Sequence, residues 1–308
     1  MNIKKKYKNL MTIPFVLLIL SCTKASEQSV VIYYSDPEAM YFIPVSIKIT
    51  LKGDVENITT AKEVTTILEQ LKVSNDEKSL RVCIPKGITF DNIEVLPYKK
   101  EIDLTLNSEK PKIGDNDEQL MIGSIVNTLT DLKGFTTVKI NAGNLKSDMD
   151  YSEPISRDSY RNNWLSTSEE VDKKSSMSNV YWFSKDKKYL VPVTVPIIKN
   201  DVTSLLKVLK SGPQGSKKHF FENSIAPDLD IIMKAVNLNH IDIEIKSKHN
   251  LAKESYDIAK KAVLMSISEL NVFDTVKFIL PNSGEDLIDL KKTNPRKELN
   301  EIKVLATN

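Results

Sequence analysis

The chain has 308 residues, about the length of two domains, and with 41% hydrophobic and 27% charged residues it is typical of a well-cored globular protein. Its 43 Lys and Arg residues nearly balance 41 Asp and Glu residues, and a net charge of +2 excludes the strong basic field of most nucleic-acid-binding proteins. Only 9 residues are Gly, which argues against loops that closely wrap a nucleotide phosphate.

The first 22 residues have the pattern of an export signal. MNIKKKYKN carries four lysines and no acid, the apolar run LMTIPFVLLIL follows, and Ser21 precedes Cys22. This order resembles a bacterial lipoprotein signal, so we expect lipidation at Cys22 and a protein anchored to the extracytoplasmic side of the cell membrane. A plain secretory signal and an uncleaved anchor are the alternatives. Without residues 1–21 the net charge is −2, and Cys83 is expected to be a small buried residue without a disulfide partner.

A first domain is expected over residues 30–143. Two β-rich segments, VVIYYSD and IPVSI, precede a helix, and a strand with alternating apolar residues, EIDLTLN, precedes a second helix and a closing strand, TTVKI. The helix positions are spaced at i, i+3, i+4 and i+7, which places them on one face. These positions are Val64, Ile67, Leu68 and Leu71 in the first helix, and Met121, Ile125, Leu129 and Leu132 in the second.

The same order recurs over residues 179–283, which we predict to be a second domain. IPVSI matches VPVTV 148 residues later, and EVTTILEQL matches DVTSLLKVL 138 residues later, so the first copy has about ten extra residues near KGDVENITTA. The apolar positions of the second copy are Val202, Leu205, Leu206, Leu209, Ala259, Val263, Ile267 and Leu270. Each copy reads ββαββαβ, and we expect an α+β fold in which the helices pack on one face of a small sheet.

The stretch LKSGPQGS, residues 209–216, looks like a phosphate-binding loop. Such a loop needs a helix after its glycines, whereas here the helix precedes them. Gly212 with Pro213 behind it therefore indicates the end of a helix.

Two further segments complete the predicted organisation. Residues 144–178 are rich in Ser, Asp, Glu and Asn and indicate a polar linker, although Tyr160 and Trp164 in it favour docking on a domain over binding a partner. Residues 284–308 are expected to form a charged tail. The aromatic strand VYWF contains Trp182, for which a core position is favoured over contact with a glycan or partner.

The ordered set of segments resembles the GerMN family. In the second copy the resemblance is carried by PVTVPI, LLKVLKSGPQGS, SIAPDL with HIDIEIK, and AKKAVLMSISELNVFDTVKFILPN; in the first, more weakly, by ILEQLK, CIPKGI, EIDLTLN and GSIVNTLTDLKGFTTVKI. The first copy lacks the Gly-Pro helix stop and has the extra segment. The resemblance implies a ring-building-motif type of fold, a structural role in the cell envelope, and sporulation or germination where the host forms spores.

The sequence contains no motif that predicts catalysis or a cofactor. The three histidines, His219, His240 and His249, are not clustered as metal ligands, and the acids of GDNDEQ before the second helix are expected to cap it rather than to bind calcium. No G-x-S-x-G occurs. We therefore expect a non-catalytic assembly module that binds envelope proteins or itself, without metal, cofactor or nucleic acid. The alternatives are a module that binds peptidoglycan or a small ligand, with Trp164 and Trp182 as candidate contacts, and an uncharacterised hydrolase.

Overall fold

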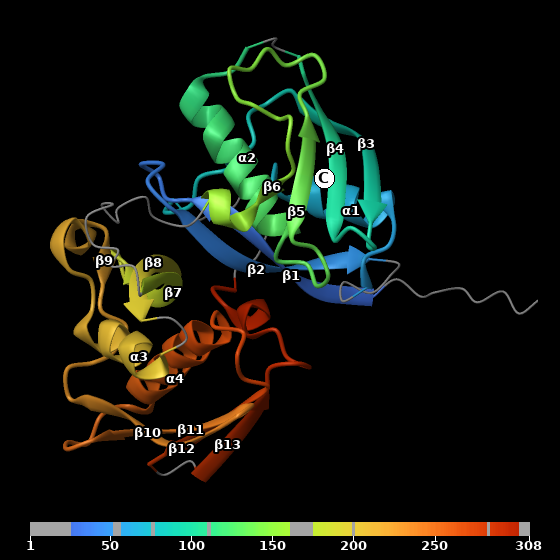
Figure 1. Ribbon diagram of the computed structural model, residues 1–308. Helices are drawn as coiled ribbons and strands as arrows, with labels where there is room; N and C mark the ends of the chain where they lie inside the picture. Colours follow the sequence, from blue (N-terminus) through green and yellow to red (C-terminus); the bar gives the residue numbers. More distant parts are fainter. Residues whose placement is uncertain are drawn as a thin grey trace, which may run out of the picture.

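The computed structural model describes residues 26–51, 57–74, 78–109, 112–160, 175–198, 201–281 and 284–301. Two domains of like architecture follow one another along the chain, and the C-terminal segment, red in Figure 1, lies between them. Cys22 and Trp164 lie outside the described residues. Within the described part, no helix has the length and apolar composition needed to cross a membrane.

The first domain consists of a hairpin and a four-stranded sheet with two helices between them. The hairpin joins β1 (Ser26–Ser35) to β2 (Phe42–Leu51). The sheet has the order β3 (Ile88–Leu96), β4 (Glu101–Ser108), β5 (Thr137–Asn141) and β6 (Ile155–Ser156), with β4 and β5 parallel and the other pairs antiparallel. The helices are α1 (Ala61–Gln70) and α2 (Asp115–Leu129).

The second domain repeats this arrangement. The hairpin of β7 (Ser175–Ser184) and β8 (Leu190–Ile198) gains a short third strand, β9 (Phe221–Glu222). The sheet has the order β10 (Leu229–Asn237), β11 (His240–Ser247), β12 (Thr275–Leu280) and β13 (Gly284–Asp289), and the helices are α3 (Val202–Ser211) and α4 (Lys253–Ser268). The predicted α+β class is confirmed, and each domain adds a hairpin on the far side of its helices.

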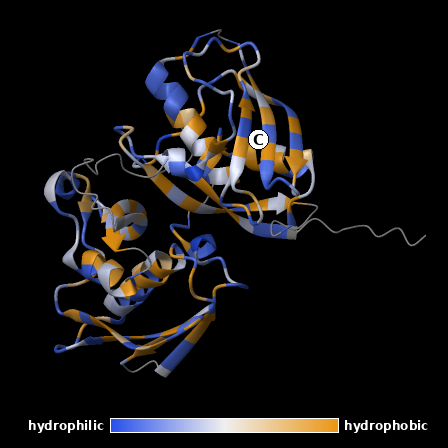
Figure 2. Cartoon of the chain, viewed as in Figure 1, coloured by the Kyte–Doolittle hydropathy of each residue, from blue (hydrophilic) through white to orange (hydrophobic). Residues whose placement is uncertain are grey.

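The predicted apolar faces form the core. Along β4 and β11 every second residue is fully buried, as the alternation predicts: Ile102, Leu104 and Leu106 in one strand, Ile241, Ile243 and Ile245 in the other. The predicted helix positions are also buried, except for Leu270, which is half-buried. Figure 2 shows the same alternation of apolar and polar residues along the sheet strands of both domains.

The helix ends follow their sequence signals in three cases and depart from them in one. Thr60 and Glu63 form a capping box at α1, Asp201 accepts backbone hydrogen bonds at the start of α3, and Gly212 ends α3 with φ of 71°. At α2 the residue before the helix is Gly114, and no side chain caps the helix. The acids of its first turn complement the helix dipole but do not cap it, and two of them bind elsewhere: Asp117 accepts from Arg81 and Glu118 accepts from Tyr151.

The expected linker and tail are largely parts of the domains. Residues 144–160 fold onto the first domain, where β6 extends the sheet, Leu145 is buried, and Tyr160 packs against the core. Residues 284–289 form β13, which pairs along its whole length with β12. Both segments have polar sequences, and their strands are held by edge hydrogen bonds, which composition does not reveal.

A candidate functional site at the domain junction

The C-terminal segment joins the two hairpins. After the short 3₁₀ helix η5 (Pro295–Glu298), the side chain of Leu299 is fully buried and its carbonyl accepts a 3.0 Å hydrogen bond from the backbone of Ser46 in β2. The Asn300 amide donates to the carbonyls of Pro44 in β2 and Leu190 in β8, both at 2.8 Å. One side chain thus bridges both domains.

Next to this segment, four charged side chains form what we call the junction cluster: Asp131, Arg157, Glu269 and Arg296. Asp131 binds Arg157 at 3.0 Å and also binds Arg296. The second guanidinium nitrogen of Arg296 donates to Glu269 at 2.8 Å. Arg296 therefore connects an acid of the first domain to an acid of the second.

Two tyrosines at equivalent positions in the repeat bond members of the junction cluster. Tyr33 is paired with Pro44 and Tyr181 with Pro192, at the same register of their hairpins. The Tyr181 hydroxyl donates to Glu269 at 2.8 Å, and the Tyr33 hydroxyl accepts a 3.3 Å hydrogen bond from Arg157.

The backbone confirms the equivalence of the two tyrosines. The amide of Tyr33 donates to Thr128 of α2, and the amide of Tyr181 donates to Ser266 of α4, each at 3.1 Å. Thr128 and Ser266 are themselves 138 residues apart, as are Asp131 and Glu269. The junction therefore brings matching parts of the two copies face to face.

Burial determines the titration of these groups. It raises the pKa of Tyr33 to about 12, and it raises the pKa of Tyr181 well above its usual value with help from the Glu269 charge. Burial alone would raise the pKa of Asp131, whose side chain is only 3% exposed, but the charges of Arg296 and Arg157 outweigh it and hold that pKa below its usual range. Asp131 is therefore charged at neutral pH.

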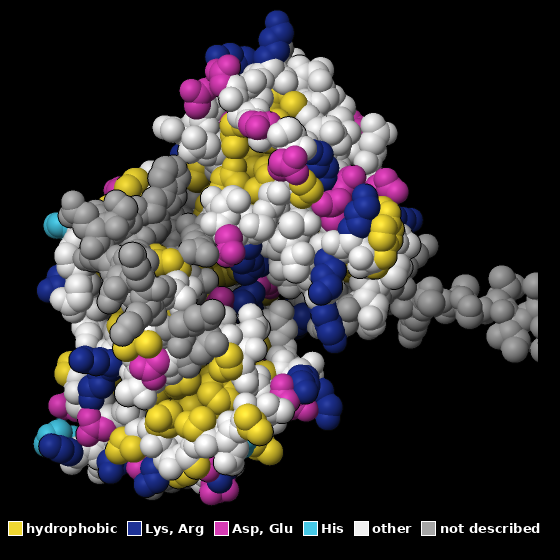
Figure 3. Space-filling view, in the orientation of Figure 1, with side chains coloured by type: hydrophobic (Ala, Val, Ile, Leu, Met, Phe, Trp, Pro, Cys, Tyr) yellow, Lys and Arg dark blue, Asp and Glu magenta, His cyan; other side chains and the backbone are white. Residues whose placement is uncertain are grey.

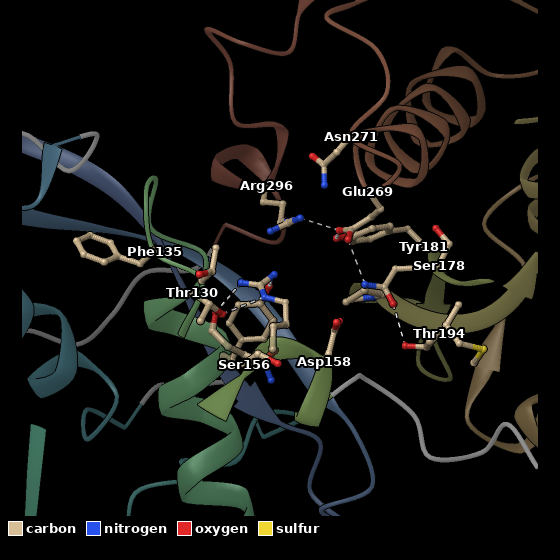
Figure 4. Close-up of a pocket in the computed structure, with 17 residues that line it drawn as sticks. Thr130, Phe135, Ser156, Asp158, Ser178, Tyr181, Thr194, Glu269, Asn271 and Arg296 are labelled. Carbon is tan, nitrogen blue, oxygen red and sulfur yellow. Dashed lines mark hydrogen bonds and ion pairs between the residues drawn. The ribbon is translucent and has the colours of Figure 1, made fainter. Parts of the chain in front are cut away.

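A cavity of about 460 Å³ opens beside the cluster, between the domains, and we call it the junction cavity (Figure 4). Its lining is mainly polar and comes from both domains. The lining residues are Tyr33, Asn127, Thr130, Phe135, Thr136, Ser156, Arg157, Asp158, Met177, Ser178, Asn179, Tyr181, Pro192, Thr194, Glu269, Asn271 and Arg296. In the space-filling view, charged side chains of both signs lie near the junction (Figure 3).

Trp182 lies in the core and not on a binding surface. Its side chain is 1% exposed, and its indole nitrogen donates to the carbonyl of Leu209 at 3.2 Å, which satisfies an acceptor in the last turn of α3. The core interpretation of VYWF is confirmed, and a surface contact through Trp182 is ruled out in this structure by its burial. Cys83 is also buried, and burial raises its thiol pKa to about 11.

The remaining candidates are dispersed. His240 binds Thr275 and Asp242, while His219 and His249 lie elsewhere in the second domain. Among the described residues, no group of three or more His, Cys, Asp or Glu side chains is placed to hold a metal ion.

Sequence reasoning missed the junction cluster. One signal was present, because Asp131 and Glu269 are acids at the same repeat position, directly after the second helix of each copy. Arg157 and Arg296 are 139 residues apart, which is also the offset between EIDLTLN and HIDIEIK, but both were overlooked because their segments have the composition of a linker or a tail.

Comparison with known proteins supports the expected fold. Residues 31–147 match the family model Germane, described as sporulation and spore germination. The solved tandem GerMN domains of the sporulation protein GerM from Bacillus subtilis are 20% identical, with a TM-score of 0.57 over 86% of this chain and 97% of that one. A putative lipoprotein from Clostridium perfringens is 16% identical over 44% of this chain and 89% of that one, and its TM-score of 0.27 is too low to support an argument. No curated protein matches the chain. The fold is that of tandem GerMN domains, as expected.

Proposed function

We propose that the chain is an exported, lipid-anchored assembly protein of the cell envelope that does no chemistry and acts in sporulation or germination where its host forms spores. The Germane match over residues 31–147 and the tandem GerMN fold support this proposal, because they relate the chain to a domain class that is not a known class of enzymes. The lysine-rich start, the apolar run and Cys22 support export and lipidation.

The observation that carries the proposal is the display of two matching apolar side chains on one frame. Tyr98, in the β3–β4 turn, is 78% exposed, and Leu238, in the β10–β11 turn, is 96% exposed. The two turns are equivalent hairpin tips of the two copies. A large apolar side chain at an exposed tip is suited to fill a pocket on a partner, and such anchors dominate the energy of many interfaces.

The junction gives these two tips a fixed relation. Arg296 links Asp131 to Glu269, and Asn300 bridges the two hairpins. The rings of Tyr41 and Phe221 also meet across the junction, with centroids 4.8 Å apart. Because the two domains are already fixed relative to each other, a partner that contacts both tips does not pay the entropy cost of ordering them. With the lipid confining the chain to the membrane surface, two weak contacts become effective together.

The test is cross-linking of a tagged chain in cells, followed by mass spectrometry of the attached proteins. We expect the same one or two envelope proteins, or a second copy of the chain, to be recovered. Tyr98→Ser and Leu238→Ser should each reduce that recovery, because each removes one apolar anchor.

Ile198→Ser is a suitable control, since Ile198 is 59% exposed and lies at the end of β8 rather than in either turn. Cys22→Ser should release the protein from the membrane fraction and lower the recovery further. If cross-linking recovers only uncomplexed chain, or if the tip variants capture as much partner as the control, the assembly function is wrong.

A further inference from the structure

We propose that the junction cavity is a binding site for a small neutral saccharide, a function beyond assembly. Its volume of about 460 Å³ is in the range of small-molecule sites, and a junction between domains is a preferred place for them.

The polar lining of the cavity is a departure from the repeat. Ser178 in β7 has the register of Val30 in β1, because Val30 pairs with Ile47 and Ser178 pairs with Val195 at the same offset. Its neighbour Asn179 corresponds in the same way to Val31. Both valines are buried, so the fold accepts valine at these positions. The amide of Asn179 is engaged within the chain, because it donates to Glu269 at 3.2 Å and accepts from Thr194 at 2.9 Å. The Ser178 hydroxyl is therefore the departure that the contacts of the described residues do not explain.

Two buried polar atoms of the lining residues, Oγ of Ser178 and Nε of Arg296, have no hydrogen-bond partner among the residues that the structure describes. A buried donor without an acceptor loses its hydration without compensation, so each such atom calls for a partner from outside the chain. The side chain of Asn271 points toward the same space from the loop after α4 (Figure 4). The residues that carry a hydroxyl, a guanidinium N–H and an amide thus line one cavity.

The charges of the walls favour a neutral ligand. Arg157 and Arg296 are already paired with Asp131 and Glu269, so the cavity has no surplus positive charge to hold an anion. Asp158, the remaining charged residue among the described residues of the wall, adds no positive charge. Saccharide hydroxyls both donate and accept, and they match a lining of hydroxyls, amides and an Nε–H donor.

Isothermal titration of the purified full chain with two neutral disaccharides, N,N′-diacetylchitobiose and maltose, tests the site. We expect saturable one-site binding of at least one of them, and the pair shows whether the acetamido group contributes. Ser178→Val should weaken binding about tenfold, because it removes one hydrogen bond while restoring the residue of the other copy. Ser211→Val, the same change on the exposed end of α3, should leave binding unchanged.

A blocked dipeptide, N-acetyl-alanyl-alanine amide, serves as a second neutral probe. Saccharide binding that Ser178→Val weakens and Ser211→Val does not supports the proposal. Three outcomes would overturn it: no saturable binding of either disaccharide, which would leave ordered water as the cavity's occupant; binding that Ser178→Val leaves unchanged; or binding of the dipeptide alone. Circular dichroism of both variants confirms that a loss of binding is not a loss of fold.

Discussion

Asp131 and Glu269 each lie at the C-terminal end of a helix, where the helix dipole disfavours a negative charge. Each is also largely removed from water, with side-chain exposures of 3% and 12%. Neither position is favourable for a lone carboxylate. The arginines therefore make the junction possible, and Arg296 does so for both acids.

Removing the charge of Asp131 should strongly destabilise the protein. Asp131→Asn leaves the half-buried Arg157 and Arg296 without their shared anion, and breaking a buried ion pair from one side costs about 3–5 kcal/mol. Urea unfolding at pH 7 measures the change. The control is Asp148→Asn, because the Lys112–Asp148 pair is 67% and 86% exposed and should contribute less than about 1 kcal/mol. Equal effects of the two variants would contradict a structural role for the cluster.

The same carboxyl predicts an acid dependence of stability. Its pKa is below the usual value of about 4 because the two arginines outweigh burial, so the unfolded chain takes up this proton first as the pH falls. The stabilisation is thus complete above about pH 4 to 5 and is lost progressively as the pH falls through the folded-state pKa. Unfolding free energies measured from pH 7 to pH 3 should fall less steeply in Asp131→Asn than in the parent chain. An identical slope in both would show that Asp131 does not titrate as described.

At the residue scale, the sequence predicts which side chains are buried better than it predicts which side chains bond each other. The spacing of Val64, Ile67 and Leu68 was enough to place them in the core, because a helical period decides which face is apolar. Nothing local decides that Asp131 meets Arg296, since 165 residues separate them and the contact depends on how two finished domains pack.

At the element scale, elements with a strong local signal were predicted and those held by edge pairing were not. The helices, the hairpins and the alternating strands carry their period in the sequence. β6 has two residues and β13 reads GEDLID, and each is a strand because it completes the hydrogen bonding of a neighbour. The predicted linker, residues 144–178, and the predicted tail, residues 284–308, therefore include residues that belong to β6, β7 and β13.

The end of α3 gives a testable case of a local signal. Gly212 has φ of 71° and ψ of −177°, a combination that is essentially restricted to glycine, and a Cβ there would lie 2.9 Å from the side chain of Asn223. Gly212→Ala should lower the unfolding free energy by about 2–3 kcal/mol.

The matched control is Gly215→Ala, a few residues along the same loop. Gly215 also has a positive φ, 56°, but a Cβ there would meet nothing within 4 Å, so only the backbone penalty of about 1–2 kcal/mol applies. Thermal and urea unfolding of both variants gives the difference. A smaller loss for Gly212→Ala than for Gly215→Ala would contradict the proposed helix stop.

At the scale of the whole molecule, the chain behaves as two copies of one domain that face each other through equivalent residues. Tyr33 and Tyr181, and Asp131 and Glu269, occupy matching positions, yet the junction is asymmetric. One C-terminal segment packs on the first hairpin, at Ser46, while the matching hairpin position, Thr194, lines the cavity.

That asymmetry makes the C-terminal segment the element whose loss should separate the domains. A chain that ends at Thr293 lacks Arg296, Leu299 and Asn300, and with them the link between the two acids, a buried apolar side chain and the bridge from Pro44 to Leu190. Each domain keeps its own sheet and helices. We therefore expect the shortened chain to stay folded while its domains move independently.

Small-angle X-ray scattering of the shortened chain should show a larger radius of gyration, and calorimetry should show two unfolding transitions in place of one. A chain that ends at Glu301 keeps every one of these contacts and should match the full chain in both measurements. If the chain ending at Thr293 also matches it, the junction is held by the hairpin contacts alone, and the fixed relation of Tyr98 to Leu238 does not depend on the C-terminal segment.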